Sequence, residues 1–208
     1  MKTTFDLQNP WRNKAYIFPQ EEYIERDIFG VLCNELTRKE ITVLVGSRQV
    51  GKTFLMKKLI EKFIAEGSVD RQQIFYFNFD AFILIDLIRN ENNFLEFLNQ
   101  YGLRGKPAYI FLDEAQRIPE AGLVLKKYYD LDLPLKFFVS GSSSLQIKSQ
   151  VKETLTGRKR LFELYPGYVR GLVICQDVIN SASPPNLTAM LRQAEEALRA
   201  ALTMENLP

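Results

Sequence analysis

One stretch, ITVLVGSRQVGKTFLMKKLI at positions 41–60, constrains the fold more than any other part of the chain. It begins with a run of mostly β-branched apolar residues, which favours a buried β-strand. A short loop with a glycine at each end follows. From Lys52 to Gly67, apolar residues then recur at the spacing of one helix face. The stretch therefore predicts a strand, a tight loop and a helix in direct succession.

The loop has the pattern Gly-x-x-x-x-Gly-Lys-Thr of a phosphate-binding loop. Its glycines let backbone N–H groups approach phosphate oxygens, and the helix adds its positive dipole end. We expect the Lys52 ammonium to reach the β- and γ-phosphates of a nucleotide, and the Thr53 hydroxyl to hold Mg²⁺. The alternatives are an ordinary strand–helix connection and side chains of Arg48 and Gln49 that point to solvent. The candidate nucleotide contacts are Gly46, Ser47, Arg48, Gln49, Val50, Gly51, Lys52 and Thr53.

Four further apolar runs predict the rest of a sheet. They are continuously apolar, as expected for parallel strands that are covered on both faces. Helical patterns alternate with them, which indicates a three-layer α/β fold with right-handed crossovers. The expected strands after the first are 74–79, 108–113, 135–140 and 160–164, and the expected helices are 52–66, 82–101, 119–130 and 144–156.

The run YIFLDEAQ at 109–116 supplies two acids at the carboxyl end of its strand. Ligands of open α/β sheets bind at that end. We expect Asp113 to hold the Mg²⁺ with its water shell and Glu114 to activate a water for attack on the γ-phosphate. The alternative is that Asp113 caps the following helix and Glu114 lies in its first turn.

Two further segments supply candidates for catalysis. Ser140, in FFVSGSSS, ends a strand at the same edge, where it can contact the γ-phosphate or the attacking water; the alternative is a helix cap. Arg158, in TGRKRLFEL, can act on the nucleotide of a neighbouring subunit as an arginine finger. A solvated basic turn explains Arg158 equally well. Trp11, the only tryptophan, is expected to pack in the core rather than beside an adenine ring.

Composition excludes several classes of protein. The 208 residues include no histidine and only two cysteines, so Cys/His zinc sites and histidine-dependent triads are excluded. A formal charge of +2 gives no global polycation for nucleic acid or anionic membranes. No apolar run is long enough to span a bilayer, and we expect a cytoplasmic protein without a membrane partner.

The composition changes after Pro166. Residues 167–208 contain no lysine, and NSASPPN reads as a linker before an amphipathic helix at 187–204. We therefore expect a nucleotide domain with an N-terminal arm at 1–166 and an atypical tail at 167–208.

Together, GSRQVGKT, YIFLDEAQ, FFVSGSSS and LTGRKRLFELYP resemble the AAA+-like P-loop ATPases of bacteria and archaea. More narrowly, they are similar to the group in which this domain precedes a C-terminal domain of unknown function. The resemblance covers about residues 5–166, the NPW of the arm included. It implies a five-stranded parallel sheet in the order 5-1-4-3-2. By this resemblance, residues 46–53 match the phosphate loop of the family, and Asp113 with Glu114 match its metal and water ligands. Ser140 matches its γ-phosphate sensor, and Arg158 matches its conserved arginine.

The sequence departs from that group after FELYP, where GYVRGLVICQDV replaces the expected lid, as in a family member truncated after the nucleotide domain. The leading hypothesis is ATP binding and Mg²⁺-dependent hydrolysis. The alternative is an ATP-binding switch or interaction module with negligible turnover, and a small-molecule kinase is a weaker third. A homo-oligomer or an unidentified protein partner fits the resemblance, and nucleic acid enters by family analogy only.

Overall fold

The computed structural model describes residues 3–20, 26–102, 105–142, 154–165 and 175–176. The tail helix expected at 187–204 and most of the helix expected at 144–156 lie outside these residues, as does nearly all of the expected tail domain.

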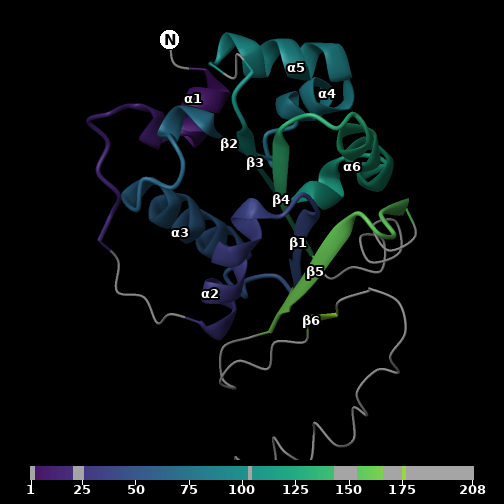
Figure 1. Cartoon of the computed structure of the whole chain (residues 1–208), viewed down its shortest axis with the longest axis horizontal. Coiled ribbons are helices and arrows are strands. Elements are labelled where there is room, and N and C mark those ends of the chain that lie inside the picture. The colour runs from purple at the N-terminus through teal and green to yellow at the C-terminus, as the bar shows by residue number, and fades with distance from the viewer. Residues whose placement is uncertain (1–2, 21–25, 103–104, 143–153, 166–174, 177–208) are drawn as a thin grey trace, which may run out of the picture. The chain divides into compact units, whose positions relative to one another are not determined.

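The centre of the described structure is a parallel β-sheet (Figure 1). Its five parallel strands have the order β2-β3-β4-β1-β5, which is the predicted order read from the other edge. A sixth strand, β6, was not expected: Cys175 and Gln176 pair antiparallel with β5. A strand of two residues has no sequence periodicity to reveal it. The parallel strands are β1 (Ile41–Gly46), β2 (Ile74–Asn78), β3 (Ala108–Asp113), β4 (Leu135–Ser142) and β5 (Lys159–Leu164).

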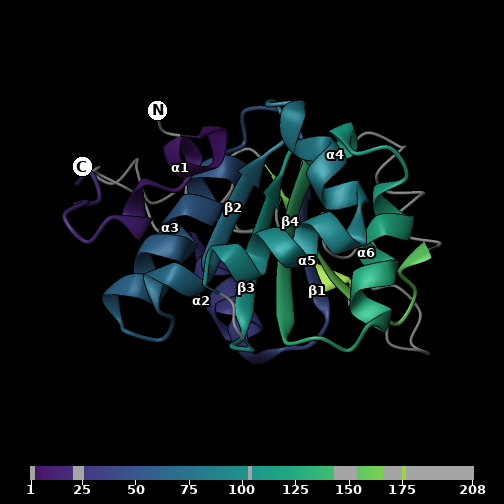
Figure 2. The same ribbon diagram turned by 90° about the horizontal axis from the view of Figure 1, so that it is seen from above.

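Helices cover both faces of this sheet, as predicted (Figures 1 and 2). The division follows the alternation of side chains along β1: Val43 and Val45 pack into one cluster of buried residues, and Leu44 packs into the other. The cluster that contains Val43 is covered by α4 (Ile83–Arg89), α5 (Glu91–Gln100) and α6 (Ala121–Asp130). The cluster that contains Leu44 is covered by α2 (Asp27–Cys33) and α3 (Lys52–Ala65). None of the helices in the described part of the chain is long and apolar enough to cross a membrane.

The prediction of one helix over 82–101 was wrong. The backbone of Asn90 is extended, and its side chain accepts a hydrogen bond from the N–H of Asn93 at 3.1 Å. Asn90 thus ends α4 and caps α5, as asparagine commonly does at helix starts. Each of the two shorter helices buries its own apolar residues, so the apolar pattern continues across the break.

An N-terminal arm protects the free edge of β2. It consists of α1 (Thr4–Gln8), the 3₁₀ helix η1 (Pro10–Arg12) and the turn that follows η1. The side-chain amide of Asn9 bonds both main-chain groups of Tyr76, and Gln8 bonds both main-chain groups of Asn78. These amides occupy donors and acceptors that an open sheet edge would leave unpaired. Trp11, which lies in η1 of the arm, is buried in the core as expected, and it also borders the cavity beside the phosphate loop.

A cluster of charged residues is buried near the amino-terminal ends of β1 and β4. Lys136 is 6% exposed, and its ammonium donates to the carbonyl of Glu40 at 2.5 Å and to the hydroxyl of Thr42 at 2.9 Å. The carboxylate of Glu35 lies beside Thr42 and pairs with Arg160 at 2.9 Å. Burial lowers the pKa of Lys136 to about 8, although nearby carboxylates oppose that shift.

Candidate nucleotide-binding site

The phosphate loop connects β1 to α3 at the carboxyl edge of the sheet. Gly46 has no room for a side chain, because a Cβ there would lie 2.4 Å from the carbonyl oxygen of Leu164. Gly51 has a φ of 88°, in the left-handed region that glycine tolerates. Ser47, Arg48 and Gln49 are exposed between these two fixed points. Val50 is buried in the core, so only its main chain is free to face a ligand.

Lys52 is folded back over the loop. Its side chain is 5% exposed, and its ammonium donates to the carbonyl oxygens of Gly46 at 3.0 Å and Ser47 at 2.8 Å. Burial lowers the pKa of Lys52, while the carboxylates of Glu114 and Asp113 oppose that shift. The loop thus holds a cation next to two acids, within reach of an anion that binds the loop.

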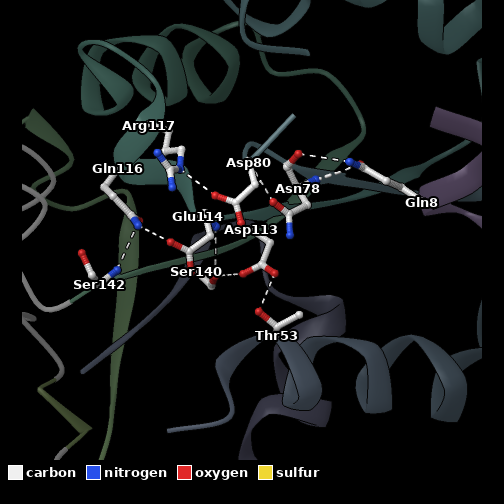
Figure 3. A network of polar contacts seen from close by, with 10 residues as sticks. All are labelled: Gln8, Thr53, Asn78, Asp80, Asp113, Glu114, Gln116, Arg117, Ser140 and Ser142. Atoms are coloured by element: carbon white, nitrogen blue, oxygen red, sulfur yellow. Dashed lines mark hydrogen bonds and ion pairs between the residues drawn. The ribbon is translucent and has the colours of Figure 1, made fainter. Parts of the chain in front are cut away.

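Asp113 is the most buried acid of the site, with no exposed surface. One oxygen, Oδ2, accepts hydrogen bonds from the hydroxyls of Thr53 and Tyr76, each at 2.7 Å. The other oxygen, Oδ1, accepts one from Ser140 (Figure 3). Burial, followed by the charge of Asp113, raises the pKa of Tyr76, so its hydroxyl stays protonated and is the donor. The contacts described for the Asp113 side chain are therefore with these three hydroxyls at the carboxyl edge of the sheet, and none of them caps a helix.

Glu114 follows at a strained position, with a φ of 58°. Its carboxylate accepts a hydrogen bond from the side-chain amide of Gln116, whose oxygen in turn accepts from the N–H of Ser142 at 3.2 Å (Figure 3). The N–H of Glu114 lies 3.4 Å from the hydroxyl of Ser140. Glu114 makes no side-chain capping bond to the 3₁₀ turn Ala115–Arg117 within the part of the chain that is described. The loop, Asp113, Glu114 and Ser140 thus meet at one edge, as the sequence predicted.

Arg158 lies elsewhere. Its carbonyl accepts from the N–H of Ile41, at the first residue of β1, and its guanidinium pairs with Asp130 at 2.7 Å. Since β1 rises ~3.3 Å per residue, Arg158 is about 17 Å from the phosphate loop along the strand direction. It does not belong to the site of its own chain. A role on the nucleotide of a neighbouring subunit stays a prediction.

Several residues of the site were missed from the sequence. Tyr76 belongs to a run that was interpreted as core, and its hydroxyl among phenylalanines was the only hint. Gln116 stands at the end of the DEAQ motif without a recognised role. Arg26 donates to the carbonyl of Tyr165 at 3.2 Å and lies next to Gly51, far from both in sequence.

A cavity of about 1110 Å³ opens beside these residues. Its lining includes Lys52, Thr53 and Glu114 of the site together with Phe54, Lys57 and Tyr16. Ligand sites usually range from about 300 to 1,000 Å³, so the cavity has room for a nucleotide. The Thr53 hydroxyl and the Asp113 carboxylate are oxygen ligands of the kind that Mg²⁺ prefers, and the two residues fit that ion.

A five-stranded sheet of this order with a phosphate loop after β1 defines an AAA+-like P-loop ATPase domain. Comparison with known families agrees: the AAA domain family matches residues 38–171, and the chain belongs to it.

Two proteins of uncharacterised function, from Mycobacterium bovis and Mycobacterium tuberculosis, are each 32% identical to the chain over 184 residues. The matched region covers 84% of this chain and 36% of each relative, so the chain spans about a third of their length. Among solved structures, Aeropyrum pernix ORC1 in complex with DNA has a TM-score of 0.50 and 14% identity. That match covers 85% of this chain and 51% of ORC1, and it reflects the fold alone.

Proposed function

We propose that the chain binds ATP and hydrolyses its γ-phosphate in a Mg²⁺-dependent reaction. The observation that carries the proposal is the buried Asp113, which contacts Thr53 of the phosphate loop and lies directly before Glu114. An acid held against the loop hydroxyl suits metal binding, and the next residue is an acid with access to the cavity. The domain at 1–166 carries this activity.

Each residue of the site has a part in this proposal. The loop N–H groups and the Lys52 ammonium bind the phosphates, because both are donors at the positive end of α3. Thr53 and Asp113 hold Mg²⁺, which when bound neutralises charge on the phosphate oxygens. Glu114 orients a water and accepts its proton during attack. Ser140, which is bonded to Asp113, senses the γ-phosphate in this proposal.

Partners follow from the family only as proposals. Arg158 is half-buried, pairs with Asp130 and lies at the end of the sheet away from its own loop, so any action on a nucleotide requires a second copy of the chain. The ORC1 structure is a complex with DNA, and nucleic acid is therefore a proposal by analogy for this chain.

A second candidate function is an ATP-binding switch with negligible turnover. The hydrogen bond from Gln116 to the Glu114 carboxylate favours it, because that bond occupies an oxygen that a water would otherwise approach. In this case ATP binds as above, but Glu114 stays with Gln116.

The test measures ATP affinity by calorimetry and turnover by phosphate release, with Mg²⁺, for the full chain. Lys52→Ala should weaken ATP binding about 10- to 100-fold, the value of a hydrogen bond to a charged group. Lys62→Ala, on the exposed face of α3, is the matched control and should bind normally. Glu114→Gln should retain ATP and lose turnover by about 10²- to 10⁴-fold.

The outcomes separate the two functions. Turnover that is equal in Glu114→Gln and the wild type removes Glu114 from catalysis. A γ-phosphate that stays intact for hours on the wild type, in a single-turnover experiment, favours the switch. No ATP binding at millimolar concentration contradicts both.

A further inference from the structure

We propose that Tyr76 is a positioning residue of the Mg²⁺ site, and that the N-terminal arm holds it in place. This inference rests on the proposed function, since it concerns how Asp113 is oriented for the metal. Tyr76 lies on β2, outside the phosphate loop and the other sequence motifs of the site.

Three hydroxyls fix the Asp113 carboxylate. Thr53 and Tyr76 donate to Oδ2, and Ser140 donates to Oδ1. An ionised carboxylate has about four lone-pair positions, so these bonds leave about one for the metal or a metal-bound water. The carboxylate has no exposed surface, and its orientation depends on these partners.

Tyr76 differs from the other two donors, Thr53 and Ser140, in the role that its hydroxyl has at the site. Under the proposed function, the hydroxyls of Thr53 and Ser140 also face the metal and the γ-phosphate, and they adjust when nucleotide binds. Tyr76 is 2% exposed, and its hydroxyl donates its hydrogen to the carboxylate, with the side chain of Asn78 as a further hydrogen-bond partner. It therefore keeps Asp113 in one orientation while the other donors respond to the nucleotide. Partners of this kind commonly contribute strongly to metal affinity.

The arm fixes Tyr76 from behind. The amide of Asn9 donates to the carbonyl of Tyr76 at 2.8 Å, and its oxygen accepts from the N–H of Tyr76 at 2.8 Å. The ring of Trp11 lies edge-on to the Tyr76 ring, with centroids 6.1 Å apart. The Asn-Pro-Trp segment is thereby connected to Asp113 through one residue, which gives this arm a part in metal binding.

The experiment compares Tyr76→Phe with the wild type in the full chain. ATP affinity is measured by calorimetry over a range of Mg²⁺ concentrations and in EDTA. Tyr76→Phe should raise the Mg²⁺ concentration at half effect about tenfold, the lower end for loss of such a partner. Its ATP affinity in EDTA should equal that of the wild type, because the loop is intact. Mn²⁺ binding to the ATP complex, followed by electron paramagnetic resonance, should weaken by the same factor.

The matched control is Tyr128→Phe. Tyr128 is also 2% exposed and donates a 2.7 Å hydrogen bond to the carbonyl of Ile88, in the last turn of α4. Loss of this hydrogen bond in Tyr128→Phe should lower the midpoint of unfolding and leave the Mg²⁺ dependence of ATP affinity unchanged. An unchanged Mg²⁺ dependence in Tyr76→Phe, or an equal shift in Tyr128→Phe, overturns the inference while the wild type still binds ATP. A wild type that does not bind ATP overturns the proposed function, and this role of Tyr76 with it.

Discussion

The side-chain amide of Gln116 donates a hydrogen bond to the carboxylate of Glu114, two residues before it. The oxygen of the same amide accepts from the N–H of Ser142, at the end of β4. One side chain thus ties the proposed catalytic acid to the strand that carries Ser140. The orientation of Glu114 depends on a residue from a neighbouring turn as well as on its own strained backbone.

We predict that Gln116→Met lowers turnover about tenfold and leaves ATP affinity unchanged. Loss of the amide frees the Glu114 carboxylate to rotate, and part of the general-base contribution of about 10²- to 10⁴-fold is lost. Steady-state phosphate release and calorimetry measure the two quantities. Gln73→Met is the control, because the side chain of Gln73 bonds only the exposed Pro107 carbonyl among the described contacts. A higher turnover in Gln116→Met would instead mean that Gln116 restrains Glu114, as the switch hypothesis requires.

We predict that Gly46→Ala destabilises the fold by about 1–3 kcal/mol and weakens ATP binding. The added Cβ would lie 2.4 Å from the Leu164 carbonyl, so β5 or the loop must move. Gly30→Ala is the matched control. Gly30 lies within α2, and a Cβ there meets nothing within 4 Å. That substitution should stabilise the protein by about 0.5–1 kcal/mol. Denaturant unfolding of both variants measures the effect, and equal stability of the two contradicts the packing argument.

We predict that Asn9→Ala lowers the free energy of unfolding by about 3 kcal/mol. Asn9 is 2% exposed and makes three side-chain hydrogen bonds, two to Tyr76 and one to the Phe5 carbonyl. Each buried group left without its partner costs about 1–3 kcal/mol. Asn13→Ala, at an exposed turn, should change stability by about 0.5 kcal/mol. Chemical denaturation checks both values, and a similar small change in Asn9→Ala would show that the arm does not stabilise the edge of β2.

We predict that the wild type gains stability relative to Lys136→Met as the pH rises from 8 to 10.5. The pKa of Lys136 is about 8 in the folded state and 10.5 in the unfolded reference. Protonation of the buried amine therefore costs stability below pH 8. That cost disappears as the pH rises through this window, because the unfolded state then loses its proton too. The relative change should reach ~3 kcal/mol, from 1.36 kcal/mol per pKa unit. Urea denaturation at several pH values measures it, and a difference that is independent of pH contradicts the prediction.

The sequence alone predicted the parallel sheet and the candidate residues that meet at its carboxyl edge. Continuous apolar runs identified the five parallel strands, and glycines with Lys52 and Thr53 identified the loop, because both signals are local in the chain. Asp113, Glu114 and Ser140 could be placed together because carboxyl ends of parallel strands meet at one edge. The break between two helices at Asn90 was not predicted, because the helical spacing of apolar residues continues through it.

Only the tertiary structure decided which side chains support those residues. Tyr76 contacts Asp113 across 37 positions of sequence, and Asn9 contacts Tyr76 across 67. Neither contact leaves a local pattern, because each depends on how separate elements pack. The same holds for Arg158, which directly precedes β5 and whose carbonyl accepts a hydrogen bond from the N–H of Ile41. Local spacing determines elements, whereas hydrogen bonds between distant elements are determined only when the core packs.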